Sequence, residues 1–161
     1  MVPYKDIFLA LDKHKIRYLV AGGFAVNFHN VQRLTADLDL ILHLEENNIL
    51  EFAKMMTSLG FIPRVPVKAE EFADANKRQE WMDHKNMKVF SFINASNPME
   101  LVDIFIKEPK PFYEMVSRQL IVDAYGVKIN VVGLDDLIAM KVTANREKDL
   151  FDIKLLQRMK P

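Results

Sequence analysis

Short apolar runs in this chain alternate with longer segments in which apolar residues recur every three or four positions. The runs predict β-strands, and the recurring spacing predicts helices with one buried face. We expect strands over residues 18–21, 37–43, 87–93, 101–106, 119–123 and 127–132. We expect a first helix beginning near Pro3 and a second that begins at Gly22-Gly23 and continues through 24–30. Further helices are expected over 45–59, 111–117 and 134–159, the last divided into two near 145–146.

Strands mixed with helices predict an α/β (α+β) domain with a mixed β-sheet flanked by helices. Ala124-Tyr125-Gly126 predicts a hairpin between the last two strands. The polar segment from Pro63 to Asn86 has no clear pattern, and we interpret it either as a mobile flap or as a short helix around Lys77–His84. Asn94–Pro98 predicts a turn between two strands.

Length and composition narrow the class of protein. The 161 residues suit one domain, 1–161, with C-terminal helices from about 134. The absence of cysteine excludes disulfides, thiolate metal sites and a cysteine nucleophile. Because 22 Lys and Arg residues balance 22 Asp and Glu residues, a broad basic surface for nucleic acid is disfavoured. The chain has no signal pattern and no run of about 18 apolar residues, so we expect a cytoplasmic protein with no membrane partner.

Two carboxylates, Asp37 and Asp39, stand out in an apolar strand segment. Side chains alternate along a strand, so these two share one face and lie about 6.6–6.8 Å apart at the backbone. Acids held together in apolar surroundings repel one another, and a cation relieves that repulsion. Oxygen ligands suit Mg²⁺ or Mn²⁺ better than zinc. The alternative is a strand end where both acids meet water.

Gly22-Gly23 follows a short buried strand and precedes a helical segment. Backbone N–H groups at such a turn can approach an anion closely at the positive end of the helix. Neither a dinucleotide fingerprint nor a Walker loop is present. Next to the acid pair, the glycines predict a phosphate cradle beside a metal site, although a plain tight turn is the alternative.

A third acid, Asp103, is the only charge within the apolar run 101–106. It is either an edge-strand acid or a third metal ligand, and in the second case it could also be the base that takes a proton from an attacking hydroxyl.

Lys141 occupies a position of the buried helical stripe in the C-terminal segment. It either extends to the helix edge or faces a pocket, where it could neutralise a triphosphate. Asp149 could pair with it or with Arg146, or it is an exposed helix acid. Arg33 and Thr35, in the connection before the acid pair, are further phosphate or substrate candidates, or part of a solvated loop.

Together these motifs resemble the DNA polymerase beta-like nucleotidyltransferase superfamily, in its branch of minimal nucleotidyltransferases related to abortive-infection toxins. The resemblance is carried by residues 21–26 (AGGFAV), 33–40 (RLTADLDL), 134–141 (LDDLIAMK) and 146–153 (REKDLFDI). It covers roughly 16–42 and 134–156, with Asp103 assigned by order along the chain. One departure is Gly23, where much of the superfamily has serine.

The resemblance implies transfer of a nucleoside monophosphate (NMP) from a nucleoside triphosphate (NTP) to an acceptor hydroxyl. It implies that Asp37, Asp39 and Asp103 bind Mg²⁺ (or Mn²⁺). It also implies that Gly22 and Gly23 hold the triphosphate with support from Lys141. The acceptor stays open between RNA, protein and a small molecule. A non-catalytic nucleotide- or partner-binding module is the main alternative, with an antitoxin-type protein as partner, and a metal-dependent phosphodiesterase is a weaker one.

Overall fold

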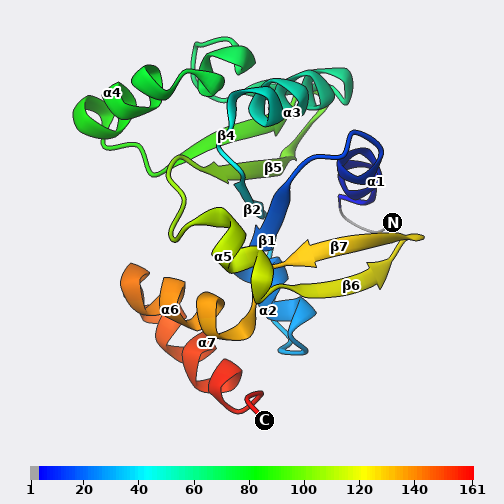
Figure 1. Ribbon diagram of the computed structural model, residues 1–161, viewed down its shortest axis with the longest axis vertical. Coiled ribbons are helices and arrows are strands. Elements are labelled where there is room, and N and C mark those ends of the chain that lie inside the picture. The colour runs from blue at the N-terminus through cyan, green and yellow to red at the C-terminus, as the bar shows by residue number, and fades with distance from the viewer. Residues whose placement is uncertain (1–3) are drawn as a thin grey trace.

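The computed structural model describes residues 4–161 and confirms a mixed sheet flanked by helices. Seven strands run in the order β3-β4-β5-β2-β1-β7-β6 (Figure 1). The β1·β7 and β2·β5 pairs are parallel, and the other pairs are antiparallel. The strands are β1 (Tyr18–Ala21), β2 (Leu38–Leu42), β3 (Phe61–Pro63), β4 (Val89–Asn94), β5 (Asn97–Phe105), β6 (Leu120–Ala124) and β7 (Val127–Val131).

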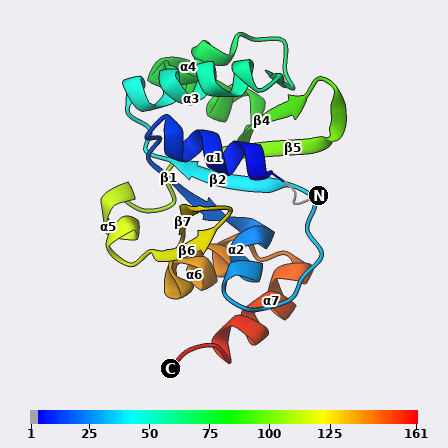
Figure 2. The ribbon, with the colours of Figure 1, turned by 90° about the vertical axis from the view of Figure 1, so that its right-hand side faces the viewer.

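Helices lie on both faces of the sheet, and a further group lies beyond the C-terminal end of strand β1 (Figures 1 and 2). α1 and α3 cover one face, α5 lies against the other, and the paired α6 and α7 extend toward the C-terminus (Figure 2). The helices are α1 (Lys5–Lys13), α2 (Gly22–Phe28), α3 (Glu46–Ser58), the 3₁₀ turn η1 (Ala69–Ala73), α4 (Ala75–Lys85), α5 (Phe112–Ser117), α6 (Leu134–Ala144) and α7 (Glu147–Gln157).

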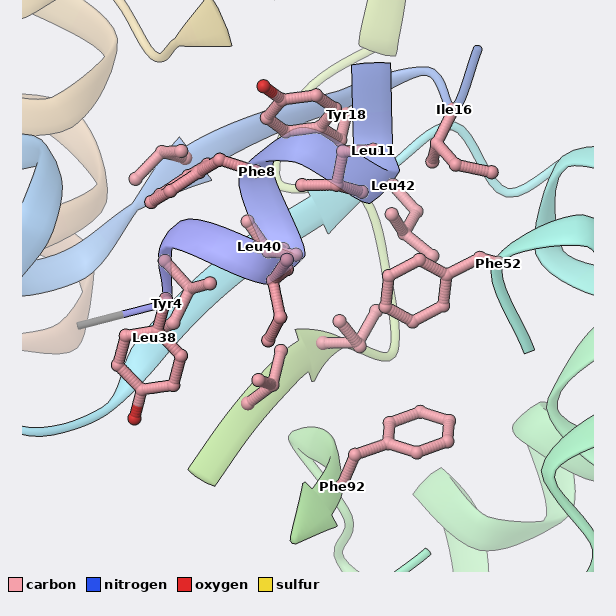
Figure 3. Close-up of a cluster of buried hydrophobic side chains, with 14 of the residues drawn as sticks. Tyr4, Phe8, Leu11, Ile16, Tyr18, Leu38, Leu40, Leu42, Phe52 and Phe92 are labelled. Atoms are coloured by element: carbon pink, nitrogen blue, oxygen red, sulfur yellow. The ribbon is translucent and has the colours of Figure 1, made fainter. Parts of the chain in front are cut away.

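Alternation along β2 produces the two faces of the sheet. Leu38, Leu40 and Leu42 are fully buried in the large core under α1 and α3 (Figure 3). Asp39 and Ile41 point to the opposite face, where Ile41 packs in a smaller cluster with residues of β1 and α5. The leucines therefore anchor a strand whose other face carries an acid.

Most expected elements are confirmed within a residue or two, and the differences have local causes. α2 begins at Gly22, so the expected start of this helix at the glycines is confirmed, and it ends two residues before Asn30. Pro98 lies inside β5 and not in a turn, because the β4–β5 hairpin extends beyond β2, which pairs only with residues 102–104 of β5. There the missing proline N–H breaks no ladder bond to β2. Pro3, near the expected start of the first helix, lies outside the described residues, and α1 begins at Lys5.

The segment that the sequence left open contains ordered structure. β3 adds an edge strand to β4, which the sequence did not indicate, and η1 leads into α4. α4 spans Ala75–Lys85, so the short-helix interpretation is confirmed. Its N-terminus is capped by the Asp74 carboxylate, which accepts from the N–H groups of Asn76 and Lys77. Among residues 4–161, no helix is long and apolar enough to cross a membrane.

Candidate active site

The predicted acids meet across two adjacent parallel strands. Asp39 of β2 is the direct register partner of Asp103 of β5, between the pairs Leu38–Val102 and Leu40–Ile104. Because direct partners in a sheet point to the same face, both carboxylates project together on the face away from α1 and α3. Asp37 lies just before β2, so the expected strand start at this residue is wrong by one position.

Burial and mutual repulsion disfavour the ionised form of these acids. Burial is the main cause that raises the pKa of Asp39 to about 6, and the charges of Asp103 and Asp37 raise it further. Burial also raises the pKa of Asp103, with the charge of Asp37 as an additional cause. Carboxylate oxygens that repel in this way fit a hard divalent cation, which supplies the missing positive charge.

The three carboxylates are neighbours, but they do not yet surround one point. Within residues 4–161, no three acidic or histidine side chains are already arranged as a metal-binding group. The carboxylate oxygens of Asp39 and Asp103, with Asp37 nearby, nevertheless fit Mg²⁺ or Mn²⁺ in their chemistry.

Ser91 fixes the third acid, and the sequence alone did not single it out. Ser91 of β4 is the antiparallel partner of Asp103, and its hydroxyl donates to Asp103 Oδ1 over 2.5 Å. The bond lowers the pKa of Asp103 and so opposes the effect of burial. One signal was present in the sequence: Ser91 is polar between Phe90 and Phe92, which are both buried in the core.

The glycine turn touches the acids directly. Gly22 has a φ of +61°, and a Cβ built there would lie 2.0 Å from Asp39 Oδ2. A Cβ on Gly23 would lie 2.4 Å from the Thr35 hydroxyl oxygen. Both positions therefore require glycine, because any larger side chain would displace a neighbouring site residue. Ala21, the N-cap of α2, has no side chain that could accept from the first N–H groups of the helix.

Lys141 is buried at the end of α6 and faces two carboxylates. It is only 4% exposed, and its ammonium donates to Asp149 over 3.3 Å and to Asp152 over 2.9 Å. Arg146 also binds Asp149, which is fully buried. Lys141 and Arg146 both lie close enough to lower the pKa of Asp39. The interpretation of Lys141 as reaching the helix edge is wrong, and so is that of Asp149 as an exposed acid.

Arg33 and Thr35 belong to a loop that is tied down at several points. The Arg33 guanidinium pairs with Asp152, which links this loop to the buried charges of α7. The Arg33 backbone N–H donates to the side-chain oxygen of Asn27 in α2 over 2.8 Å. Arg33 is thus a part of the cationic network and not a freely solvated side chain. Asn27, which the sequence reasoning missed, holds the loop against the helix after the glycine turn.

These contacts bring an acidic cluster and a cationic network close to each other beside one glycine turn. The acids are Asp37, Asp39 and Asp103, and the network joins Arg33, Lys141, Arg146, Asp149 and Asp152. Such an arrangement suits a ligand that carries both a divalent cation and a polyphosphate.

A family model agrees with this chemistry. The model for the nucleotidyl transferase AbiEii toxin of type IV toxin–antitoxin systems matches residues 7–161, nearly the whole chain. The chain belongs to the AbiEii family. It is therefore a nucleotidyltransferase, and the sequence-based resemblance to toxin-related nucleotidyltransferases is confirmed.

Solved structures share the fold of this AbiEii-family protein at low sequence identity. Lincosamide antibiotic adenylyltransferase LnuA, bound to lincomycin, has a TM-score of 0.63 and 16% identity over 99% of each chain. ANT(2'')-Ia, in complex with adenylyl-2''-tobramycin, has a TM-score of 0.59 and 16% identity over 94% of this chain and 83% of its own. A putative nucleotidyltransferase from Thermotoga maritima has a TM-score of 0.57 and 13% identity over 97% and 91%. No curated protein matches the sequence.

Proposed function

We propose that this AbiEii-family protein transfers an NMP group from an NTP to an acceptor hydroxyl with Mg²⁺ or Mn²⁺, as the toxin of a toxin–antitoxin pair. The observation that carries the proposal is the direct pairing of Asp39 with Asp103 beside Gly22, where a Cβ would collide with the Asp39 carboxylate. Family membership supports nucleotidyl transfer, and the acid geometry supports the cation dependence.

Asp37, Asp39 and Asp103 are the residues that would hold the cation. A bound divalent ion would neutralise phosphate charge and make the α-phosphorus more electrophilic. The raised pKa of Asp39 favours this role, because a carboxylate that is costly to ionise alone gains most from a cation.

We assign the base of the reaction to Asp103 as well. Its Oδ1 accepts from Ser91, which leaves Oδ2 able to accept a proton from the acceptor hydroxyl. In the reaction, the acceptor oxygen bonds to the α-phosphorus and the bond to the β-phosphate oxygen breaks. Pyrophosphate leaves with that electron pair, and the hydroxyl proton goes to Asp103.

The triphosphate would lie along the glycine turn. The N–H groups of Gly22 and Gly23 open α2 without a side-chain cap, which suits phosphate oxygens. Lys141 has three N–H bonds, and two of them serve Asp149 and Asp152. The third would donate to a phosphate of the bound triphosphate. Arg33 and Thr35 would support this contact by holding the loop and the network in place.

Transfer of a labelled NMP group from NTP to the components of a cell extract tests the proposal and identifies the class of acceptor. We expect Mg²⁺-dependent transfer of labelled NMP by wild type and at least a hundredfold less by Asp39→Asn. Asp123→Asn is the matched control, because this acid is 80% exposed on β6 and pairs only with Lys128. Separation of RNA, protein and small-molecule fractions then identifies the acceptor class. Equal labelling by wild type and Asp39→Asn would refute the proposed chemistry.

Expression in cells tests the toxin role separately. We expect wild type and Asp123→Asn to arrest growth and Asp39→Asn to leave growth unaffected. Arrest by Asp39→Asn at equal protein level would instead support the non-catalytic alternative, in which the fold acts by binding a nucleotide or a partner protein.

A further inference from the structure

Tyr4 bridges the two segments that carry the acids, although it lies at the start of the described chain. Its phenol oxygen lies 2.6 Å from the carbonyl oxygen of Ala36 and 3.1 Å from the backbone nitrogen of Leu101. A phenol has one proton to donate and can still accept. The shorter contact makes Ala36 the acceptor, and the Leu101 N–H donates to the phenol oxygen.

This bridge occurs where the β2·β5 ladder ends. The pairing starts at Leu38–Val102, and no direct partner pair precedes it. The Tyr4 hydroxyl therefore joins the two backbones one step before the first rung. Ala36 is adjacent to Asp37, and Leu101 is two residues before Asp103, so the bridge sets the spacing of the chain segments that present both carboxylates.

Tyr4 acts from the face opposite the acids. Its ring is 5% exposed and belongs to the core that contains Leu38 and Leu40, as Figure 3 shows, whereas Asp39 and Asp103 project on the other face. The ring also packs edge-on against Phe24 of α2, with centroids 5.5 Å apart. Tyr4 is thus in contact with the acid loop, β5 and the helix of the glycine turn.

We propose that Tyr4 is a positioning residue whose hydroxyl fixes the relative placement of Asp37 and Asp103 for cation binding. This inference rests on the proposed function, because it assigns a role toward the cation of that reaction. Groups outside the metal ligands that orient them commonly affect metal affinity or activity by about 10–100-fold.

Tyr4→Phe tests the role, and Tyr18→Phe is the matched control. Tyr18 is also buried, 4% exposed, and its hydroxyl accepts from the Asn130 N–H over 3.4 Å, away from the acids. Both variants remove one hydroxyl from a buried ring. We expect Tyr4→Phe to weaken Mn²⁺ binding, measured calorimetrically, by about tenfold or more, and Tyr18→Phe to leave it within twofold. Unchanged Mn²⁺ affinity in folded Tyr4→Phe would overturn the positioning role.

Hydrogen exchange gives a second test that needs no variant. If the bridge and the cation site are coupled, Mg²⁺ must stabilise the bridge in return. We expect Mg²⁺ to slow exchange of the Leu101 amide in wild type by about tenfold and to leave the Asn130 amide unchanged. An unaffected Leu101 amide would overturn the inference even if Tyr4→Phe does not fold. Wild type that neither binds Mn²⁺ nor transfers NMP would refute the proposed function instead.

Discussion

Replacement of Asp39 by asparagine is expected to abolish activity and yet stabilise the fold. The folded protein raises the pKa of this carboxyl from 3.8 to about 6, mainly through burial and then through the charges of Asp103 and Asp37. Each rise of one in pKa corresponds to about 1.4 kcal/mol. Without a cation, the ionised carboxylate therefore lowers the free energy of unfolding by up to about 3 kcal/mol at pH 8.

The sign and the pH window follow from the same shift. A carboxyl with a raised pKa binds its proton more tightly in the folded state, so its destabilising effect is absent below about pH 4 and complete above about pH 6. We expect Asp39→Asn to be more stable than wild type by about 3 kcal/mol at pH 8 and by about 1.6 kcal/mol at pH 5. For a chain of this length, the larger stabilisation corresponds to a rise in Tm of about 6–12 °C.

Urea and thermal unfolding in EDTA at pH 5 and pH 8 measure both values. Asp123→Asn, a change at an exposed acid, should leave stability unchanged at both pH values. Addition of Mg²⁺ should stabilise wild type and narrow its difference from Asp39→Asn. A variant no more stable than wild type at pH 8, or a difference that does not shrink at pH 5, would refute the electrostatic argument.

Three further predictions concern the glycine turn, the buried ion pairs and pH. Gly22→Ala should abolish activity, because the added Cβ would collide with the Asp39 carboxylate. Gly60→Ala is the control: Gly60 has a φ of +84° and open space around it, so this variant should keep activity and lose only about 1–2 kcal/mol of stability. Asp149→Ala should lower the free energy of unfolding by about 3–5 kcal/mol in urea titrations, because it breaks the buried ion pair with Lys141. Asp135→Ala should lower it by less than about 0.5 kcal/mol, because the Asp135 side chain is 75% exposed. Mn²⁺ binding should weaken as pH falls through about 6, where Asp39 takes up a proton, while circular dichroism at pH 5 shows the fold intact.

The sequence predicted the elements and the acids better than their mutual placement. The period-two pattern of Leu38 and Leu40 was enough to identify β2 and to put Asp39 on the other face. The pattern could not show that β2 pairs with β5, because two α-helices, one 3₁₀ turn and two strands intervene along the chain. The order of motifs in a resembling family supplied Asp103 in place of that missing long-range information.

Hydroxyl contacts were the features least accessible to sequence reasoning. Tyr4 reaches backbone atoms of Leu101, 97 positions away, and backbone partners leave no residue-type pattern. Ser91 bonds a side chain across a hairpin and differed from its neighbours only in polarity. Helical spacing placed Lys141 in a buried stripe but left open whether it reaches the helix edge or faces a pocket, and its bond to Asp152 in the buried network decides between the two.

The two halves of the site differ in charge balance. The network around Lys141 pairs opposite charges, whereas the cluster of Asp37, Asp39 and Asp103 gathers like charges. Lys141 is held by buried carboxylates, and Asp149 has a lowered pKa because its bonds and charges from Arg146 and Lys141 outweigh burial. Asp39 and Asp103 instead have raised pKa values, with burial and like charge acting against ionisation. The ion pairs of the first half need no further charge, whereas a bound cation would lower the electrostatic free energy of the acidic half. This imbalance is the physical reason to expect that binding of a cation–nucleotide complex, and not folding itself, completes the active arrangement.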